Sequence, residues 1–119
     1  MRCISSTLYR CALREKGVLI FGSGNVVHNL ARIDWRMSGG FSWAVDFDSY
    51  IKGKITSRQY QDVINYQLAG QSAQLAFYTP ERFYPLLYVL GAARRDDRLI
   101  VFNDSCMLGS ISMTCYLFE

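Results

Sequence analysis

A single histidine, His28, is the side chain best suited to catalysis or metal binding in this sequence. A neutral imidazole can coordinate a metal ion or accept a proton near neutral pH. Catalytic zinc and non-haem iron sites commonly use two or three histidines, and this chain cannot supply such a set. A Ser-His-Asp arrangement would also have to use His28. From spacing alone, a hydrogen-bonded structural histidine is the alternative interpretation.

A glycine-rich turn, Gly-Ser-Gly-Asn at residues 22–25, comes just before His28. It follows a short apolar run and precedes a segment with helical spacing, and Gly24 is expected to supply a positive φ in the turn. A G-x-G turn at the carboxyl end of a strand is typical of dinucleotide-binding loops. Val27 stands where the G-x-G-x-x-G fingerprint requires its third glycine. A small nucleotide-binding module is therefore only a distant hypothesis.

The elements that must position these residues alternate between helices and short apolar strands. Residues 18–21 are apolar and bounded by glycines, which predicts a strand buried on both faces. Ser42, Thr56 and residues 79–81 are predicted helix starts, and Pro85 is expected to bend the last helix. The pattern predicts helices over about 5–16, 26–33, 42–55, 57–70 and 80–91, and strands over 18–21, 99–102 and 111–118. We therefore expect an α/β fold with a mixed β-sheet flanked by helices.

The composition excludes several classes of protein. With 119 residues, 50% of them hydrophobic and 19% charged, the chain fits one folded domain and not a disordered segment. A net charge of +3 without a basic stripe argues against a nucleic-acid partner. The absence of a long apolar run argues against a membrane span, and residues 1–6 lack the apolar region of a secretory signal, so we expect a cytoplasmic protein. The four cysteines (Cys3, Cys11, Cys106 and Cys115) form no C-x-x-C pair and are expected to be free thiols.

Four segments, taken in order, resemble class III extradiol ring-cleavage dioxygenases of the DOPA extradiol dioxygenase-like branch. Residues 17–30 resemble the S-G-N-x-x-H-N-L segment of that family, and residues 43–48 resemble its W-A-x-x-F-D helix. Residues 79–92 resemble T-P-E-H-x-x-P-L-x-x-V-L-G-A, and residues 109–113 resemble the terminal G-S-x-S strand. The resemblance covers about residues 8–118 and extends over the C-terminal half of the catalytic domain. Residues 1–119 are therefore expected to form a single partial domain.

The resemblance implies an activity, a cofactor and a set of site residues. The activity is O2-dependent opening of a catechol ring beside its two hydroxyls, at a non-haem Fe(II) or a Zn(II) ion. The metal would bring the catecholate and O2 into one coordination sphere, so both are implied partners. His28 stands at one metal-ligand position of the family. Ser23, Asn25 and Asn29 lie on the loop next to the implied site.

Two departures from the family pattern bear on activity. The H-G-S-P and S-A-H-W segments, which carry the other metal ligands in the family, are absent, so this chain supplies one ligand only. Arg82 occupies the position of the histidine in T-P-E-H, the proposed acid and base acting on the substrate. Arginine stays protonated at neutral pH and cannot relay a proton, although it can pair with a carboxylate or a catecholate.

The sequence therefore predicts an extradiol dioxygenase-like protein whose catalytic machinery is incomplete in this chain alone. The alternative is a non-catalytic remnant, or a subunit that docks with a partner carrying the missing metal-ligand half. A gene fragment, a split subunit and a degenerate paralogue are all compatible with the sequence.

Overall fold

The computed structural model describes residues 12–119, which form helices and short strands. Residues 12–15 are helical, and residues 16–29 contain no further helix or extended strand. The elements that follow are, in chain order, η1 (Leu30–Arg32), α2 (Ser42–Thr56), α3 (Tyr60–Ile64), η2 (Tyr66–Ala69), α4 (Gln71–Ala76), η3 (Pro80–Arg82), α5 (Tyr84–Ala92), β1 (Leu99–Phe102), β2 (Cys106–Met107), β3 (Ile111–Ser112) and β4 (Cys115–Phe118), where η marks a 3-10 helix.

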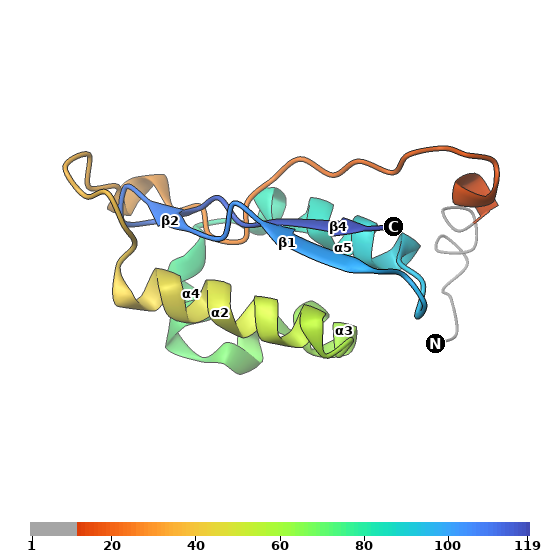
Figure 1. Ribbon diagram of the computed structural model, residues 1–119. Coiled ribbons are helices and arrows are strands. Elements are labelled where there is room, and N and C mark those ends of the chain that lie inside the picture. The colour runs from red at the N-terminus through yellow and green to blue at the C-terminus, as the bar shows by residue number, and fades with distance from the viewer. Residues whose placement is uncertain (1–11) are drawn as a thin grey trace.

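The strands form two antiparallel pairs, β1 with β4 and β2 with β3, which follow one another along the molecule (Figure 1). Among the described residues, parallel pairing is confined to single-residue bridges, which join His28 to Phe77 and Gly40 to Gly109. The predicted combination of helices with a mixed sheet is thus confirmed, and antiparallel pairing dominates it.

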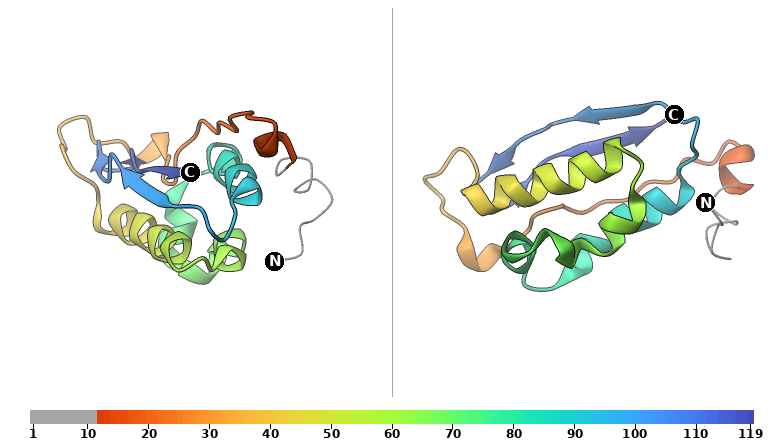
Figure 2. Two further views of the ribbon diagram at one scale, coloured as in Figure 1. Left: turned by 45° about the vertical axis from the view of Figure 1, so that its right-hand side comes forward. Right: turned by 90° about the horizontal axis from the view of Figure 1, so that it is seen from below.

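The helices pack around the two strand pairs (Figure 2). Helices α2 and α3 lie below the β1–β4 pair, and α5 lies beside it. An extended coil formed by residues 18–25 runs along α5 on the side away from α2. Within residues 12–119, no helix combines the length and apolar character needed to cross a bilayer.

Four aromatic rings form the centre of the core. They belong to Phe47, Tyr66, Phe77 and Phe83, and their centroids lie 5.1–6.5 Å apart. Phe47 comes from α2, whereas Phe77 and Phe83 flank the segment that leads into α5, and both Phe47 and Phe83 are 0% exposed. Because edge-to-face and stacked rings at these distances stabilise one another, the cluster fixes residues 77–83 against α2.

The strand predictions for the C-terminal third are confirmed in large part. β1 covers the predicted residues 99–102. The predicted strand over residues 111–118 is divided into β3 and β4, since Ser112 and Thr114 direct hydroxyls to Asp48 on α2 and the chain bends between the two strands. β2 was not predicted, because two residues carry too little pattern to indicate a strand.

The predicted buried strand at residues 18–21 is wrong for this chain. These residues run as an extended coil, and no backbone N–H or C=O group of residues 19–24 is hydrogen-bonded within the part of the chain that the structure describes. Leu19 is 77% exposed and Phe21 is 82% exposed. A strand requires hydrogen bonds to a neighbouring backbone, and among the described residues no other strand pairs with this segment.

The predicted helix at residues 26–33 is also wrong, apart from the single turn of η1. The Val27 carbonyl accepts a hydrogen bond from the Ser112 backbone N–H at 3.0 Å, and the His28 N–H donates to the Ala76 carbonyl at 2.8 Å. Since these groups are engaged with distant segments, they cannot form the i to i−4 bonds of a helix. The segment therefore lacks the helix N-terminus on which a dinucleotide-binding loop depends.

The helix at residues 42–55 is confirmed as α2, but the predicted caps differ. Phe41 occupies the N-cap position of α2, and its side chain forms no cap. Thr56 donates its hydroxyl to the Lys52 carbonyl instead of starting the next helix. The predicted helix up to Gly70 is divided between α3 and η2, and the unpredicted α4 follows it. Pro85 lies in the first turn of α5, where its missing N–H costs no helical bond, so the expected bend does not arise.

Gly24 is essential for a reason other than the expected one. Its φ is not positive, since the glycines with positive φ among residues 12–119 are Gly17, Gly70 and Gly109. A Cβ atom at position 24 would instead overlap the carbonyl oxygen of Arg82. The turn at residues 22–25 therefore requires glycine because two segments of main chain touch there.

We expect Gly24→Val to lower the free energy of unfolding by more than about 1 kcal/mol, because overpacking forces the backbone apart. The matched control is Gly39→Val, where a new Cβ would meet no atom within 4 Å. Urea unfolding followed by circular dichroism measures both. Equal stability of the two variants would show that residues 24 and 82 are not in contact.

Asp97 anchors the first described helix to the end of α5. Its carboxylate, 6% exposed, accepts two hydrogen bonds from the Arg14 guanidinium at 2.7 and 2.9 Å, and one from the Arg94 backbone N–H at 2.6 Å. Burial alone would raise the pKa of Asp97, but the hydrogen bonds from Arg14 and Arg94 outweigh it and lower the pKa. The charged form of Asp97 is therefore the stabilising one.

Asp97→Asn is expected to destabilise the protein by about 1.5–3 kcal/mol at pH 7, the usual contribution of hydrogen bonds to a charged group. Since the pKa of Asp97 is lower in the folded state, its stabilisation is present above the unfolded pKa of about 3.9 and is lost as the pH falls through the folded value. The difference between variant and wild type should thus shrink below about pH 4 in urea titrations. Asp96→Asn, at an exposed neighbouring position, is the control; a difference that persisted at low pH would contradict the assignment.

Candidate functional site

His28 lies where three distant segments meet. It forms single-residue bridges with Phe77 on one side and Ile111 on the other, and its backbone N–H donates to the Ala76 carbonyl at 2.8 Å. The residue is half-buried, and within the described chain its imidazole makes no hydrogen bond. The main chain is thus held on both sides while both ring nitrogens are available.

Asn25 connects the His28 loop to the segment that carries Arg82. The Asn25 backbone N–H donates to the Arg82 carbonyl at 2.8 Å, and its side-chain Nδ2 donates to the Ser112 carbonyl at 2.8 Å. The structure therefore brings Asn25, His28 and Arg82 to one region of the molecule. Ser23 is exposed on the same loop, two residues before Asn25.

Asn29 is placed differently, because its side chain is directed into the protein. It is 6% exposed, and its Nδ2 donates to the Leu75 carbonyl at 2.8 Å. Its own carbonyl accepts a hydrogen bond from the buried Ser110 hydroxyl at 2.7 Å. Among the described atoms the Asn29 Oδ1 is buried without a partner. Asn29 fixes the residue next to His28, and a role toward a substrate stays a prediction.

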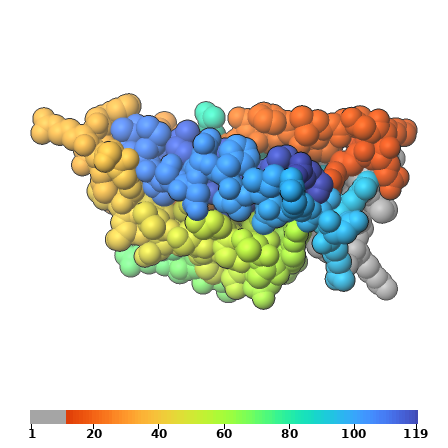
Figure 3. Space-filling model, viewed as in Figure 1, coloured from red at the N-terminus to blue at the C-terminus, as the bar shows by residue number. Residues whose placement is uncertain are grey.

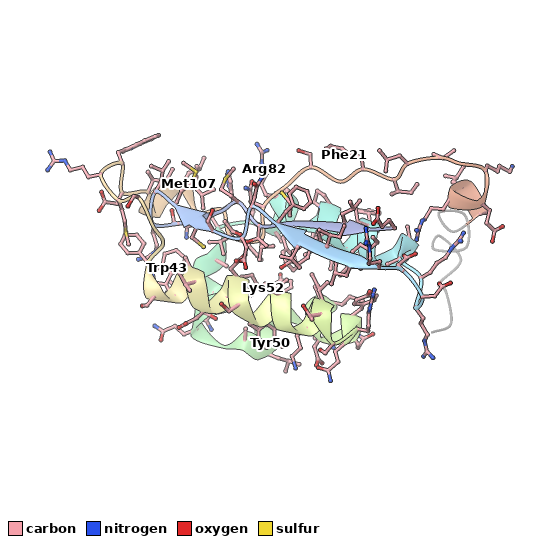
Figure 4. All side chains as sticks on the ribbon, viewed as in Figure 1. Phe21, Trp43, Tyr50, Lys52, Arg82 and Met107 are labelled. Atoms are coloured by element: carbon pink, nitrogen blue, oxygen red, sulfur yellow. The ribbon has the colours of Figure 1, made fainter. Side chains whose placement is uncertain are left out.

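Arg82 ends η3 and is exposed. Its side chain projects from the same side of the molecule as Phe21 and away from α2 (Figure 4). The neighbouring Glu81 has its pKa lowered by a hydrogen bond from the Thr79 side chain, so it is charged at neutral pH. The segment beside the His28 loop thus carries an exposed arginine whose main chain is anchored to the loop.

Sequence reasoning assigned Asp48 to a family motif but missed its structural role. This carboxylate on α2 is 4% exposed and accepts hydrogen bonds from the Ser112 hydroxyl at 2.5 Å and the Thr114 hydroxyl at 2.8 Å. Ser112 in turn holds the His28 loop through the Val27 carbonyl and the Asn25 side chain. The signal was an aspartate beside Phe47 on the apolar stripe of α2, where a charge is buried only if it is paired.

Asp48→Ala is expected to lower the free energy of unfolding by about 1–3 kcal/mol, because the Ser112 and Thr114 hydroxyls lose their acceptor inside the protein. Asp46→Ala is the matched control, since Asp46 lies on the same helix and is exposed. Thermal melts of the two variants give the comparison. Similar melting temperatures would mean that the carboxylate contributes nothing to holding β3 and the loop.

The residues present do not fit a complete Fe(II) or Zn(II) site. Within residues 12–119, no three histidine, cysteine, aspartate or glutamate side chains come together as a possible ligand group. Cys106 and Cys115 are free thiols, as predicted, and burial, followed by the nearby Asp48 carboxylate, raises the pKa of Cys106 to about 11. Cys106 is thus protonated at neutral pH and is a poor ligand. Cys3 and Cys11 lie outside the described residues. The metal-ligand role of His28 stays a prediction.

Comparison with known proteins identifies relatives, although no family model matches the chain. The 4,5-DOPA dioxygenase extradiol of Escherichia coli K12 is 37% identical over 106 residues, which cover 86% of this chain and 39% of that protein. The 4,5-DOPA dioxygenase extradiol of Beta vulgaris is 33% identical over 106 residues, which cover 89% of this chain and 40% of that protein.

A solved structure of similar fold and sequence supports the same relationship. An uncharacterized protein from Escherichia coli K12 superposes with a TM-score of 0.81 at 34% identity, covering 93% of this chain and 48% of that one. The chain spans about two-fifths of the length of the curated relatives it matches, in their C-terminal part. From this similarity in sequence and structure, we conclude that the chain belongs to the extradiol dioxygenase family as a partial, C-terminal match.

Proposed function

We propose that this chain supplies one part of an extradiol dioxygenase site and is inactive in catechol ring opening on its own. In this proposal residues 1–119 form one partial domain, and His28 is its one ligand to a non-haem Fe(II) or Zn(II). Ser23, Asn25 and Asn29 form the loop beside the substrate, and Arg82 faces the substrate. The remaining ligands belong to the part of the family's chain that this sequence lacks.

The observation that carries the proposal is the way the structure holds His28 and Arg82 on neighbouring segments. The Asn25 N–H to Arg82 carbonyl bond fixes the two segments together, and the aromatic cluster fixes residues 77–83 behind them. This main-chain contact supports the proposal that the His28 imidazole and the Arg82 guanidinium serve one site. A guanidinium can pair with an anionic catecholate or with a carboxylate. The relatives are named as dioxygenases of DOPA, a catechol that carries a carboxylate.

A second candidate function is a non-catalytic subunit. It is favoured by Arg82, because a guanidinium cannot exchange protons with a substrate at neutral pH. On this alternative, His28 and Arg82 would hold a catechol-type molecule or a partner without turning it over. The two candidates share the same residues and differ in whether product forms once the other part of the site is supplied.

The test pairs this chain with the N-terminal part of the Escherichia coli relative, produced as a separate polypeptide. After loading with Fe(II) under anaerobic conditions, O2 and DOPA are added and the ring-opened product is followed by its absorbance. We expect no product from this chain alone, slow formation from the pair, and none from the pair that carries His28→Ala. Pairing that binds DOPA but forms no product would support the subunit alternative.

A metal titration separates binding from activity. With a chelating dye as competitor, Zn(II) should bind this chain only weakly, because one imidazole is far short of the three protein ligands of a catalytic site. A tight one-to-one site that survives His28→Ala in the chain alone would overturn the assignment of His28.

A further inference from the structure

The segment that runs through η2 and α4 carries no charged side chain from residue 63 to residue 80. Charged residues make up 19% of the whole chain, so an uncharged stretch of this length is exceptional in it. The segment lies on the other side of α2 from the strands (Figures 1 and 2), and in Figure 3 its green atoms form part of the lower border of the molecule. The solvent side of a surface helix normally carries charged and polar residues. This surface therefore differs from the rest of the exterior in the kind of partner that it suits.

One side of this segment is buried and the other is exposed. Val63 and Ala76 are 0% exposed and belong to the hydrophobic core. On the exposed side, Leu68 of η2 is 69% exposed, and Ile64 at the end of α3 is 46% exposed. The other exposed side chains of residues 63–76 are amides. We define the amide face as the exposed residues Ile64, Asn65, Gln67, Leu68, Gln71 and Gln74.

The main chain under the amide face is held by hydrogen bonds within the segment. The Leu68 N–H, for example, donates to the Asn65 carbonyl at 3.0 Å. Asp62, the charged residue that comes just before the face in the chain, is paired with Lys54 at 3.1 Å. The face is therefore preformed, so binding does not have to order its backbone, and the charge at its border is already compensated.

Charge decides which partner suits the amide face. A face without charge offers nothing to a partner that is recognised through its opposite charge. In a dimer with two-fold symmetry the same surface meets itself, so a charged residue near the axis would face a like charge. Each copy of this chain carries a net charge of +3, and on the amide face two copies can meet without like charges opposite each other. Because an amide both donates and accepts hydrogen bonds, a glutamine can also pair with the glutamine of a second copy.

We propose that the amide face is the contact between two copies of this chain, which pack around a two-fold axis with Leu68 of one copy against Leu68 of the other. Ile64 extends the apolar centre, and the glutamines form the polar rim, which is the usual arrangement of a protein interface. The contact uses no residue of the candidate site, so it does not depend on the proposed function. It also leaves the coil at residues 18–25 outside the interface, since that coil runs along α5 on the side away from α2.

Sedimentation equilibrium of the 119-residue chain, over a dilution series from about 1 mM downward, measures the association. We expect a dimer that dissociates on dilution. Leu68→Asp should weaken the association by at least about 30-fold, because it removes the apolar centre and places two carboxylates at the axis. Leu30→Asp is the matched control, since Leu30 is 62% exposed and lies outside the amide face, and it should leave the dimer unchanged.

A charge exchange tests the symmetry of the contact. Leu68→Lys should be monomeric by itself, as Leu68→Asp is, whereas a mixture of the two variants should form a heterodimer because opposite charges meet at the axis. Recovery in the mixture also shows that neither variant is unfolded. A chain that stays monomeric at about 1 mM, a dimer that Leu30→Asp weakens equally, or a mixture that stays monomeric would overturn the inference. A dimer that Phe21→Asp dissociates and Leu68→Asp does not would also overturn it, since the contact would then lie on the coil.

Discussion

Replacing Arg82 by histidine in the pair formed with the N-terminal part of the Escherichia coli relative should raise the rate of ring opening by about 10²–10⁴-fold, the usual contribution of one general acid or base. An imidazole can release and accept a proton near neutral pH, whereas a guanidinium cannot. The exchange should leave the loop unchanged, because position 82 contacts Asn25 through its carbonyl oxygen. The measurement is kcat for DOPA, with product absorbance as the signal.

Two further observations separate a proton relay from a change in substrate binding. Arg82→Lys keeps a positive charge and should bring no gain in kcat. The Arg82→His rate should depend on pH around the ordinary histidine value of about 6.5, a dependence that the arginine protein lacks. A full rate with Arg82 retained would show that no proton passes through this position.

Phe83→Ala should have the largest effect on stability, with a loss of about 3–5 kcal/mol, as for other buried phenylalanines. Phe83 is 0% exposed, and its ring lies 5.1 Å from that of Tyr66, 5.5 Å from that of Phe77 and 6.0 Å from that of Phe47. Since small domains have only about 5–15 kcal/mol in total, a partial domain should be largely unfolded by this change at 37 °C.

Tyr78→Ala is the control for Phe83→Ala, because Tyr78 is 92% exposed and lies in the same segment. Circular dichroism melts should show a nearly unchanged transition for Tyr78→Ala. A cooperative melt of Phe83→Ala near the wild-type temperature would contradict the assignment of the aromatic cluster as the core.

Two apolar runs of the same composition show how far the sequence could predict the fold. Residues 99–102 (Leu-Ile-Val-Phe) were predicted as a strand and form β1, because β4 follows closely in the chain and pairs with it. Residues 18–21 (Val-Leu-Ile-Phe) carry the same signal but remain a coil. Periodicity and composition indicate a preference for a strand, whereas its formation depends on a backbone neighbour that the sequence pattern cannot reveal.

In the site too, the sequence predicts what neighbouring residues do together but not which distant segments meet. The prediction that Ser23 and Asn25 lie on a loop close to His28 followed from their adjacency and agrees with the structure, whereas His28 itself was expected in a helix and lies on the loop. The contact between Asn25 and Arg82 joins residues 57 positions apart, and the support of the loop by Asp48 runs through Ser112. These contacts join the loop at residues 22–29 to η3, β3 and, through Ser112, to α2, and no single segment encodes them.

The main-chain nature of the Asn25–Arg82 contact has an evolutionary consequence. A histidine codon becomes an arginine codon by one base substitution, and at this position the exchange leaves the supporting hydrogen bond in place. The side chain is exposed, so neither residue disturbs the core. A lineage can therefore lose a proton-relaying group at position 82 in a single mutational step, without passing through an unstable intermediate sequence.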